Sequence, residues 1–278
     1  MTISIQKLTT LALVVSGASL AACNLGAAGL ENTDAATQEL TADGNEAVAS
    51  NLQHASFGDL AFSVTEKDPT LAANEVIAPT SQVFSSGCST RTKDPTNPKV
   101  VHIHFVDCTG PFGLRHLSGD ETAVFSSNAD GTLHVALSDD GNLTVNGRPV
   151  QHSGAGDITI AGTQRNVAWK GAWTRENDRG LTVSHTNDMS IVVDTATGCH
   201  TRNGTGVTLV GTREIDTKID NLEVCRNASG ERGCPSGTVT HTAKKSGKSV
   251  TVEFDGTAIA SVTGRNGQTA DVPLVCTP

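Results

Sequence analysis

The chain has 278 residues, a formal net charge of −9, few aromatic residues (3%) and no tyrosine. Its basic residues do not form a cluster that could neutralise phosphates, which excludes nucleic acid as an expected partner. Gly-x-Ser-x-Gly, His-Glu-x-x-His and phosphate-binding Gly-rich motifs are all absent from the sequence. We therefore expect no cofactor and favour a non-catalytic function, although a triad assembled from distant residues has no local signature.

The amino terminus has the pattern of an export signal. Residues 1–22 carry one charge, Lys7, followed by the apolar run 8–22. This run is shorter than the roughly 20 residues that a membrane-spanning helix needs. We therefore interpret residues 1–22 as a signal peptide and not as a membrane helix.

The end of this segment carries a more specific motif, Leu20-Ala21-Ala22-Cys23. It resembles the lipobox of bacterial lipoproteins. The resemblance covers only the first two dozen residues and implies that a diacylglycerol is attached to the Cys23 thiol, that a lipoprotein peptidase cleaves between Ala22 and Cys23, and that the new amino group receives an acyl chain such as palmitate. Asn24 in place of Asp resembles lipoproteins that are passed on to the outer membrane. The expected location is the bacterial cell envelope, and the expected membrane contact is the lipid anchor.

Charge and composition divide the mature chain into two parts. Residues 24–78 carry nine carboxylates and one lysine, a balance of −8, while residues 79–278 carry only −2. The Ala- and Gly-rich start of the acidic part favours a flexible tether, because such a composition buries little apolar surface. Leu60, Phe62 and Val64 alternate as a strand does. We expect a tether over residues 23–78 that is partly ordered toward its end, and a β-rich domain over 79–278.

The domain shows a period of two with turns at short intervals. Leu133, Val135 and Leu137 alternate with polar residues, and Asn146-Gly147 is a favoured sequence for a two-residue hairpin. The same alternation recurs up to the carboxyl terminus, and few stretches have a helical period. The sequence predicts an all-β fold, an antiparallel hairpin meander that forms either an extended twisted sheet or a sandwich. It resembles β-rich envelope lipoproteins of Gram-negative bacteria in style, without a diagnostic motif.

Six cysteines remain once Cys23 is assigned to lipidation. An even number in an exported chain predicts three disulfides that staple the domain, although six cysteines allow many pairings. We favour Cys88–Cys108, Cys199–Cys225 and Cys234–Cys276, with Cys225–Cys234 as a competing pair. Zinc binding is a weaker alternative because no pair has the Cys-x-x-Cys spacing.

His102 and His104 are weak candidates for metal ligands, and we predict no metal site from them alone. They lie on one face of the expected strand 100–106, as His-x-His ligand pairs do. A metal would need a further ligand, for which His116, His134 and Asp107 are available. The competing interpretation is that both imidazoles lie on a half-buried face.

His152 and Ser153 are adjacent, so they point to opposite faces of a strand and do not form a nucleophile–base pair.

Three other patterns allow a binding function. The Asp-rich turns 128–131 and 139–142 have calcium-binding side chains, but they lack the ligand spacing of an EF-hand and suit hairpins equally well. Trp169 and Trp173 would form a sugar- or protein-binding platform if they are exposed, and would be core residues if they are buried.

The expected function is that of a lipid-anchored envelope protein with a structural or binding role and an unknown protein or polysaccharide partner. The alternatives are an exported hydrolase or metal-dependent enzyme that uses His102 and His104, and a binding module that uses the two tryptophans.

Overall fold

The computed structural model describes residues 64–77, 87–109, 116–177, 180–226, 233–264, 267–274 and 276. The expected signal peptide, Cys23 and the tether up to residue 63 lie outside the described residues. In the described part the chain forms one helix, α2 (Pro69–Ile77), and no helix there is long and apolar enough to cross a membrane. The rest is β-structure with short turns.

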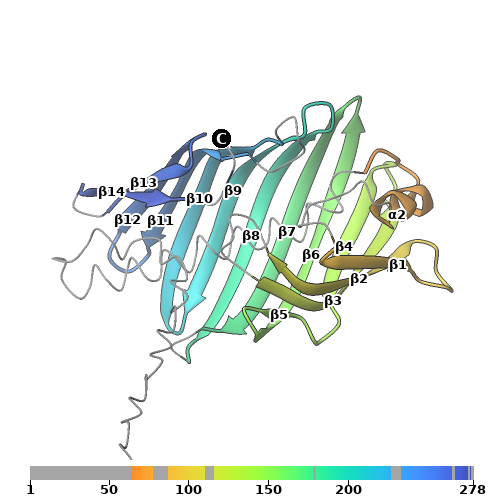
Figure 1. The fold of residues 1–278 in the computed structure, drawn as a ribbon, viewed down its shortest axis with the longest axis horizontal. Helices are drawn as coiled ribbons and strands as arrows, with labels where there is room; N and C mark the ends of the chain where they lie inside the picture. The colour runs from red at the N-terminus through yellow and green to blue at the C-terminus, as the bar shows by residue number, and fades with distance from the viewer. Residues whose placement is uncertain are drawn as a thin grey trace, which may run out of the picture.

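Fourteen strands follow the helix in the described ranges (Figure 1). They are β1 (Ser89–Lys93), β2 (Val100–Thr109), β3 (His116–Ser127), β4 (Leu133–Asp139), β5 (Thr144–Val145), β6 (Arg148–Ala161), β7 (Gln164–Glu176), β8 (Thr182–Asp194), β9 (Cys199–Val210), β10 (Arg213–Val224), β11 (Ser236–Ala243), β12 (Lys248–Asp255), β13 (Ile259–Thr263) and β14 (Thr269–Pro273).

All fourteen strands belong to one antiparallel sheet. Thirteen of them lie side by side in chain order, and the short β5 pairs with β3 and β6 beside this path. Figure 1 shows the sheet as one continuous twisted layer from β1 at one edge to β14 at the other. The predicted all-β hairpin meander is confirmed, and of the two predicted architectures the extended twisted sheet is the observed one.

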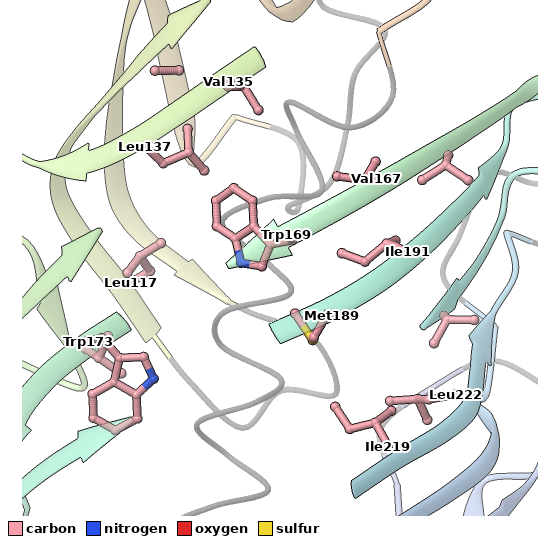
Figure 2. Close-up of a cluster of buried hydrophobic side chains, with 14 of the residues drawn as sticks. Leu117, Val135, Leu137, Val167, Trp169, Trp173, Met189, Ile191, Ile219 and Leu222 are labelled. Atoms are coloured by element: carbon pink, nitrogen blue, oxygen red, sulfur yellow. The ribbon is translucent and has the colours of Figure 1, made fainter. Parts of the chain in front are cut away.

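Alternating burial defines two faces of the sheet. On β7, for example, Val167, Trp169 and Trp173 are buried while Ala168 and Lys170 are exposed. We call the face with the buried side chains the inner face and the opposite one the outer face. Figure 2 shows inner-face side chains of β3, β4, β7, β8 and β10 directed into a common interior. The apolar positions of the period-two pattern therefore form the core, as expected from burial of apolar surface.

Turn chemistry follows the predicted pattern at the hairpin between β5 and β6. Asn146 and Gly147 have φ angles of 52° and 73°. Both turn positions need a positive φ, which Asn and Gly adopt at low cost. Gly256, in the turn between β12 and β13, has a φ of 84° for the same reason.

Residues 64–77 pack on the sheet. The Val64 carbonyl accepts a hydrogen bond from Arg165 Nε of β7 (2.5 Å), and Val64 is 1% exposed. The helix α2 then buries Ala72, Ala73 and Val76, and its contacts are with β1, β2 and β3. The end of the acidic segment thus belongs to the folded part of the chain, which begins before residue 79.

Three disulfides close the fold. Cys88 before β1 joins Cys108 in β2, and Cys199 in β9 joins Cys225 after β10. Cys234 before β11 joins Cys276 beyond β14. This is the pairing that the sequence analysis favoured, and the competing pair Cys225–Cys234 does not form.

Candidate functional site

His102 and His104 both point outward from β2, but they have separate partners. The side chains are 43% and 52% exposed. His102 Nε2 lies 3.2 Å from Asp94 Oδ2, and its Nδ1 lies 3.1 Å from Thr122 Oγ1. His104 Nδ1 lies 2.7 Å from Asp120 Oδ1. Each imidazole therefore has its own carboxylate hydrogen-bond partner, and both side chains are exposed rather than half-buried.

The residues considered as a third metal ligand belong to two further His–Asp pairs. His116 Nδ1 lies 2.9 Å from Asp107 Oδ1, and His134 Nδ1 lies 2.7 Å from Asp157 Oδ1. In the ranges that the structure describes, no group of three or more His, Cys, Asp or Glu side chains could hold a metal ion. The geometry therefore brings each candidate imidazole to one carboxylate and not to a common centre.

The His134–Asp157 pair has the geometry of the contact between base and carboxylate in a catalytic triad. Asp157 also accepts a hydrogen bond from Asn128 Nδ2 (2.8 Å), and hydrogen bonds from His134 and Asn128 hold the Asp157 pKa below its usual value. Ser126 lies opposite His134 across β3 and β4. No hydrogen bond joins Ser126 and His134 among the described residues, so the nucleophile–base contact of a triad is not formed.

The carboxylates of the Asp-rich turns accept hydrogen bonds from nearby residues of the same chain. Asp130 Oδ1 accepts hydrogen bonds from the Thr132 amide (2.9 Å) and hydroxyl (2.7 Å), which lower the Asp130 pKa. Asp139 accepts hydrogen bonds from the Gly141 and His152 amides. These carboxylates serve the turns and the β4–β6 contact, which agrees with the hairpin interpretation.

Both tryptophans face the interior, with 0% of Trp169 and 2% of Trp173 exposed. A stacking platform for a sugar or protein needs an exposed indole. Burial therefore favours the interpretation of both residues as core, and it removes the surface on which the tryptophan-based binding hypothesis depended.

A groove of about 740 Å³ crosses the outer face over β4, β6, β7, β8 and β9. Two rows of mostly small outward-facing side chains flank it, and Lys170 pairs with Asp188 within it (3.3 Å). The outward-facing residues of the lining are Ala136, Ser153, Ala155, Lys170, Ala172, Thr186, Asp188, Thr205 and Val207. The groove is open, uncharged overall and rich in methyl and hydroxyl groups.

An inward-facing row of small residues lies between these two flanks. Gly154, Gly171, Asn187 and Gly206 stand in register across β6 to β9. Gly154 also has a role on the inner side, because a Cβ there would lie 2.2 Å from Trp169 Cζ2. The indole of Trp169 is thus seated directly on the glycine backbone beneath the groove.

The inner face carries a row of polar residues that sequence reasoning missed. Glu121 of β3 and His152 of β6 form a fully buried pair with 2.9 Å between Oε1 and Nδ1. Burial raises the Glu121 pKa. In register with His152 follow Trp173, His185 and Thr208 on β7, β8 and β9. The row thus crosses the sheet perpendicular to its strands.

Two histidines of this region pair with threonines directly opposite them. His185 Nδ1 lies 2.9 Å from Thr208 Oγ1, and His241 Nδ1 lies 2.9 Å from Thr217 Oγ1. Burial lowers the pKa of both imidazoles to about 3, and for His185 the positive charge that His241 would carry adds to the effect. The period-two pattern marks these residues as inward-facing, but only the register brings them together.

Comparison with known proteins adds no relatives. No family model, no curated protein and no solved structure matches this chain.

Proposed function

We propose that this chain is a lipid-anchored protein of the bacterial cell envelope, directed to the outer membrane, whose disulfide-bonded sheet has a structural or binding role. The observation that carries the proposal is Leu20-Ala21-Ala22-Cys23 at the end of the apolar run. The three disulfides support it, because they use six of the seven cysteines and leave Cys23 outside them. Disulfides also suit an exported protein in an oxidising compartment.

The segment after Cys23 supports a tethering role. Residues 24–63 contain six carboxylates and no lysine or arginine. A single acyl chain binds a membrane only marginally, and each buried methylene adds about 0.8 kcal/mol, so the two or three chains of a lipoprotein make a stable anchor. An acidic segment repels itself and extends, which would hold the sheet away from the membrane.

Fractionation of the cells tests the anchor. The full chain should sediment with the outer membrane, whereas Cys23→Ser should leave an uncleaved precursor or a soluble product. Ala28→Ser, five residues downstream, serves as the matched control and should fractionate like the unchanged chain. A cleaved, membrane-bound Cys23→Ser product would contradict the proposal.

The outer-face groove supports a binding role over catalysis. Its hydroxyls, Ser153, Thr186 and Thr205, have no imidazole beside them within the lining, because His152 lies on the opposite face. Its single cation, Lys170, is neutralised by Asp188. An open surface of this kind suits contact with an uncharged, extended segment of protein or polysaccharide.

Site-specific photo-crosslinking in cells separates binding from a purely structural role. A photoreactive residue at Thr186 should give defined adducts with one envelope component. The same residue at Glu253, which is exposed on β12 outside the groove, serves as the control. Adducts of equal yield at both positions would contradict a contact through the groove.

A further inference from the structure

His241 is a buried imidazole whose hydrogen-bond partner is a neutral hydroxyl. It is 0% exposed and lies on β11 between Thr217 of β10 and Val250 of β12, which face it in register. The Thr217 hydroxyl bonds to Nδ1, and Nε2 has no hydrogen-bond partner within the described residues. A hydroxyl satisfies a neutral imidazole but does not neutralise an imidazolium, so this site is built for the uncharged form.

His185 repeats the arrangement on the same inner face. Its Nδ1 bonds to Thr208, and its ring stacks on Trp173 with 5.8 Å between the ring centroids. The guanidinium of Arg175 lies 5.4 Å from the centre of the same indole. His185 and the Arg175 guanidinium thus contact the same indole, and His185 also lies within electrostatic range of His241.

From β7 to β13 the other ionisable side chains of the inner face are basic. No carboxylate occupies an inward-facing position of the described parts of β7 to β13. The buried Glu121 lies farther along the sheet on β3 and is paired with His152. The basic groups at inward-facing positions of β7 to β12 are Arg165, Arg175, His185, His200, Arg202, Arg213, His241 and Lys248. A positive charge on either imidazole would therefore meet only like charges from the strands around it.

We propose that His185 and His241 form an acid-sensitive latch, which keeps β8 to β11 closed while both rings are neutral and opens these strands when acid supplies protons to them. Closure excludes water and leaves both rings uncharged. Opening hydrates the rings, which then bind protons as ordinary histidines do. Acid therefore stabilises the open form.

The pH window follows from the two protonation states. The ordinary histidine pKa is about 6.5, whereas the closed form holds both pKa values at about 3. Well above pH 6.5 neither form binds these protons, and the closed form has its full stability. As the pH falls below 6.5 the open form gains protons first, and each imidazole shifts the equilibrium toward opening by up to about tenfold per pH unit.

The interval between pH 6.5 and 5 isolates the two imidazoles from most carboxylates. Ordinary Asp and Glu side chains titrate near pH 4, and the lowered pKa values of Asp120 and Asp157 place their folded-state titration still lower. Glu121 acts in the opposite direction, because its raised pKa lets the closed form take a proton first. Any acid-induced loss of stability in this interval therefore does not come from these carboxylates.

The test is denaturant unfolding of the full chain at a series of pH values, with hydrogen exchange to locate the opening. Below pH 6 the unfolding equilibrium should rise by up to about 100-fold per pH unit for the unchanged chain and by about tenfold for His241→Gln. His134→Gln, on the outer face, is the control and should match the unchanged chain. Exchange protection corrected for intrinsic rates should fall first in β8 to β11 and later in β2 to β4.

Equal pH dependence of the unchanged chain and His241→Gln between pH 6.5 and 5 would overturn the latch. A second measurement needs no variant. The imidazole NMR signals of His185 and His241 in the closed protein should stay those of the neutral ring down to pH 5. Protonation of either ring in the closed form near pH 6.5 would overturn the proposal independently.

Discussion

The packing of Trp169 determines that residue 154 is a glycine. The indole covers the glycine so closely that an added Cβ would meet Trp169 Cζ2 at 2.2 Å and Cη2 at 2.6 Å. Trp169 is fully buried. The φ of Gly154 is not positive, so packing and not backbone conformation requires a glycine here.

Gly154→Ala should destabilise the protein by about 1–2 kcal/mol. Overpacking of a core costs about 1–3 kcal/mol, which outweighs the roughly 0.4–1 kcal/mol that reduced flexibility of the unfolded chain contributes. Urea unfolding followed by tryptophan fluorescence measures the change. Gly264→Ala is the control, because its nearest neighbour would be 3.7 Å away. The Gly154→Ala effect should shrink in a Trp169→Phe background, and an undiminished effect there would contradict the proposed clash.

At the residue scale the structure also distinguishes two groups among the histidines, and the buried His152, which pairs with Glu121, belongs to neither. His102, His104, His116 and His134 lie outward and each meets an aspartate. His185 and His241 lie inward and meet threonines. Residue type alone does not distinguish these groups, because the sequence neighbours of both are alternating polar and apolar residues. The strand register supplies the partner, and the partner decides whether the ring sits beside an anion or in an apolar core.

Among the elements, the edge strands depend most on covalent support. Among the described strands β14 pairs only with β13 and so has a neighbour on one side. Cys234–Cys276 links the chain before β11 to the chain after β14 and so encloses the last four strands. The other two disulfides each connect strands that are already paired side by side.

Removal of Cys234–Cys276 as a Ser pair should therefore have the largest effect of the three disulfide deletions. Loop-closure entropy predicts a loss of about 3.9 kcal/mol for this bridge and about 3.3–3.5 kcal/mol for the shorter loops. Hydrogen exchange should show the difference more clearly than global stability, with protection lost first in β12 to β14. Uniform loss of protection across the sheet would contradict an edge-clamping role for this disulfide.

At the scale of the whole molecule, periodicity and turn chemistry were enough to predict an all-β hairpin meander. The alternation at Leu133, Val135 and Leu137 and the Asn146-Gly147 turn are local features, and each describes a strand or a hairpin correctly. The choice between one sheet and two depends on which strands pair at long range. Period two does not contain that information, since it gives each strand a buried face in either architecture.

The candidate site was less predictable for the same reason. The sequence indicated His102 and His104 as neighbours on one face, which is correct, but their pairing with Asp94, directly after β1, and with Asp120 of β3 depends on the strand register. The groove arises from mostly small residues on five strands, and the inner polar row also arises from residues on five. Such sites have no linear motif, because each strand contributes at most three members.

Mass spectrometry of the amino-terminal peptide of the mature protein tests the central claim most directly. If the chain is a lipid-anchored envelope protein, the peptide begins at Cys23 and carries the mass of a diacylglyceryl group and an amide-linked acyl chain. An unmodified peptide beginning at Cys23, or a chain that retains residues 1–22, would contradict the account.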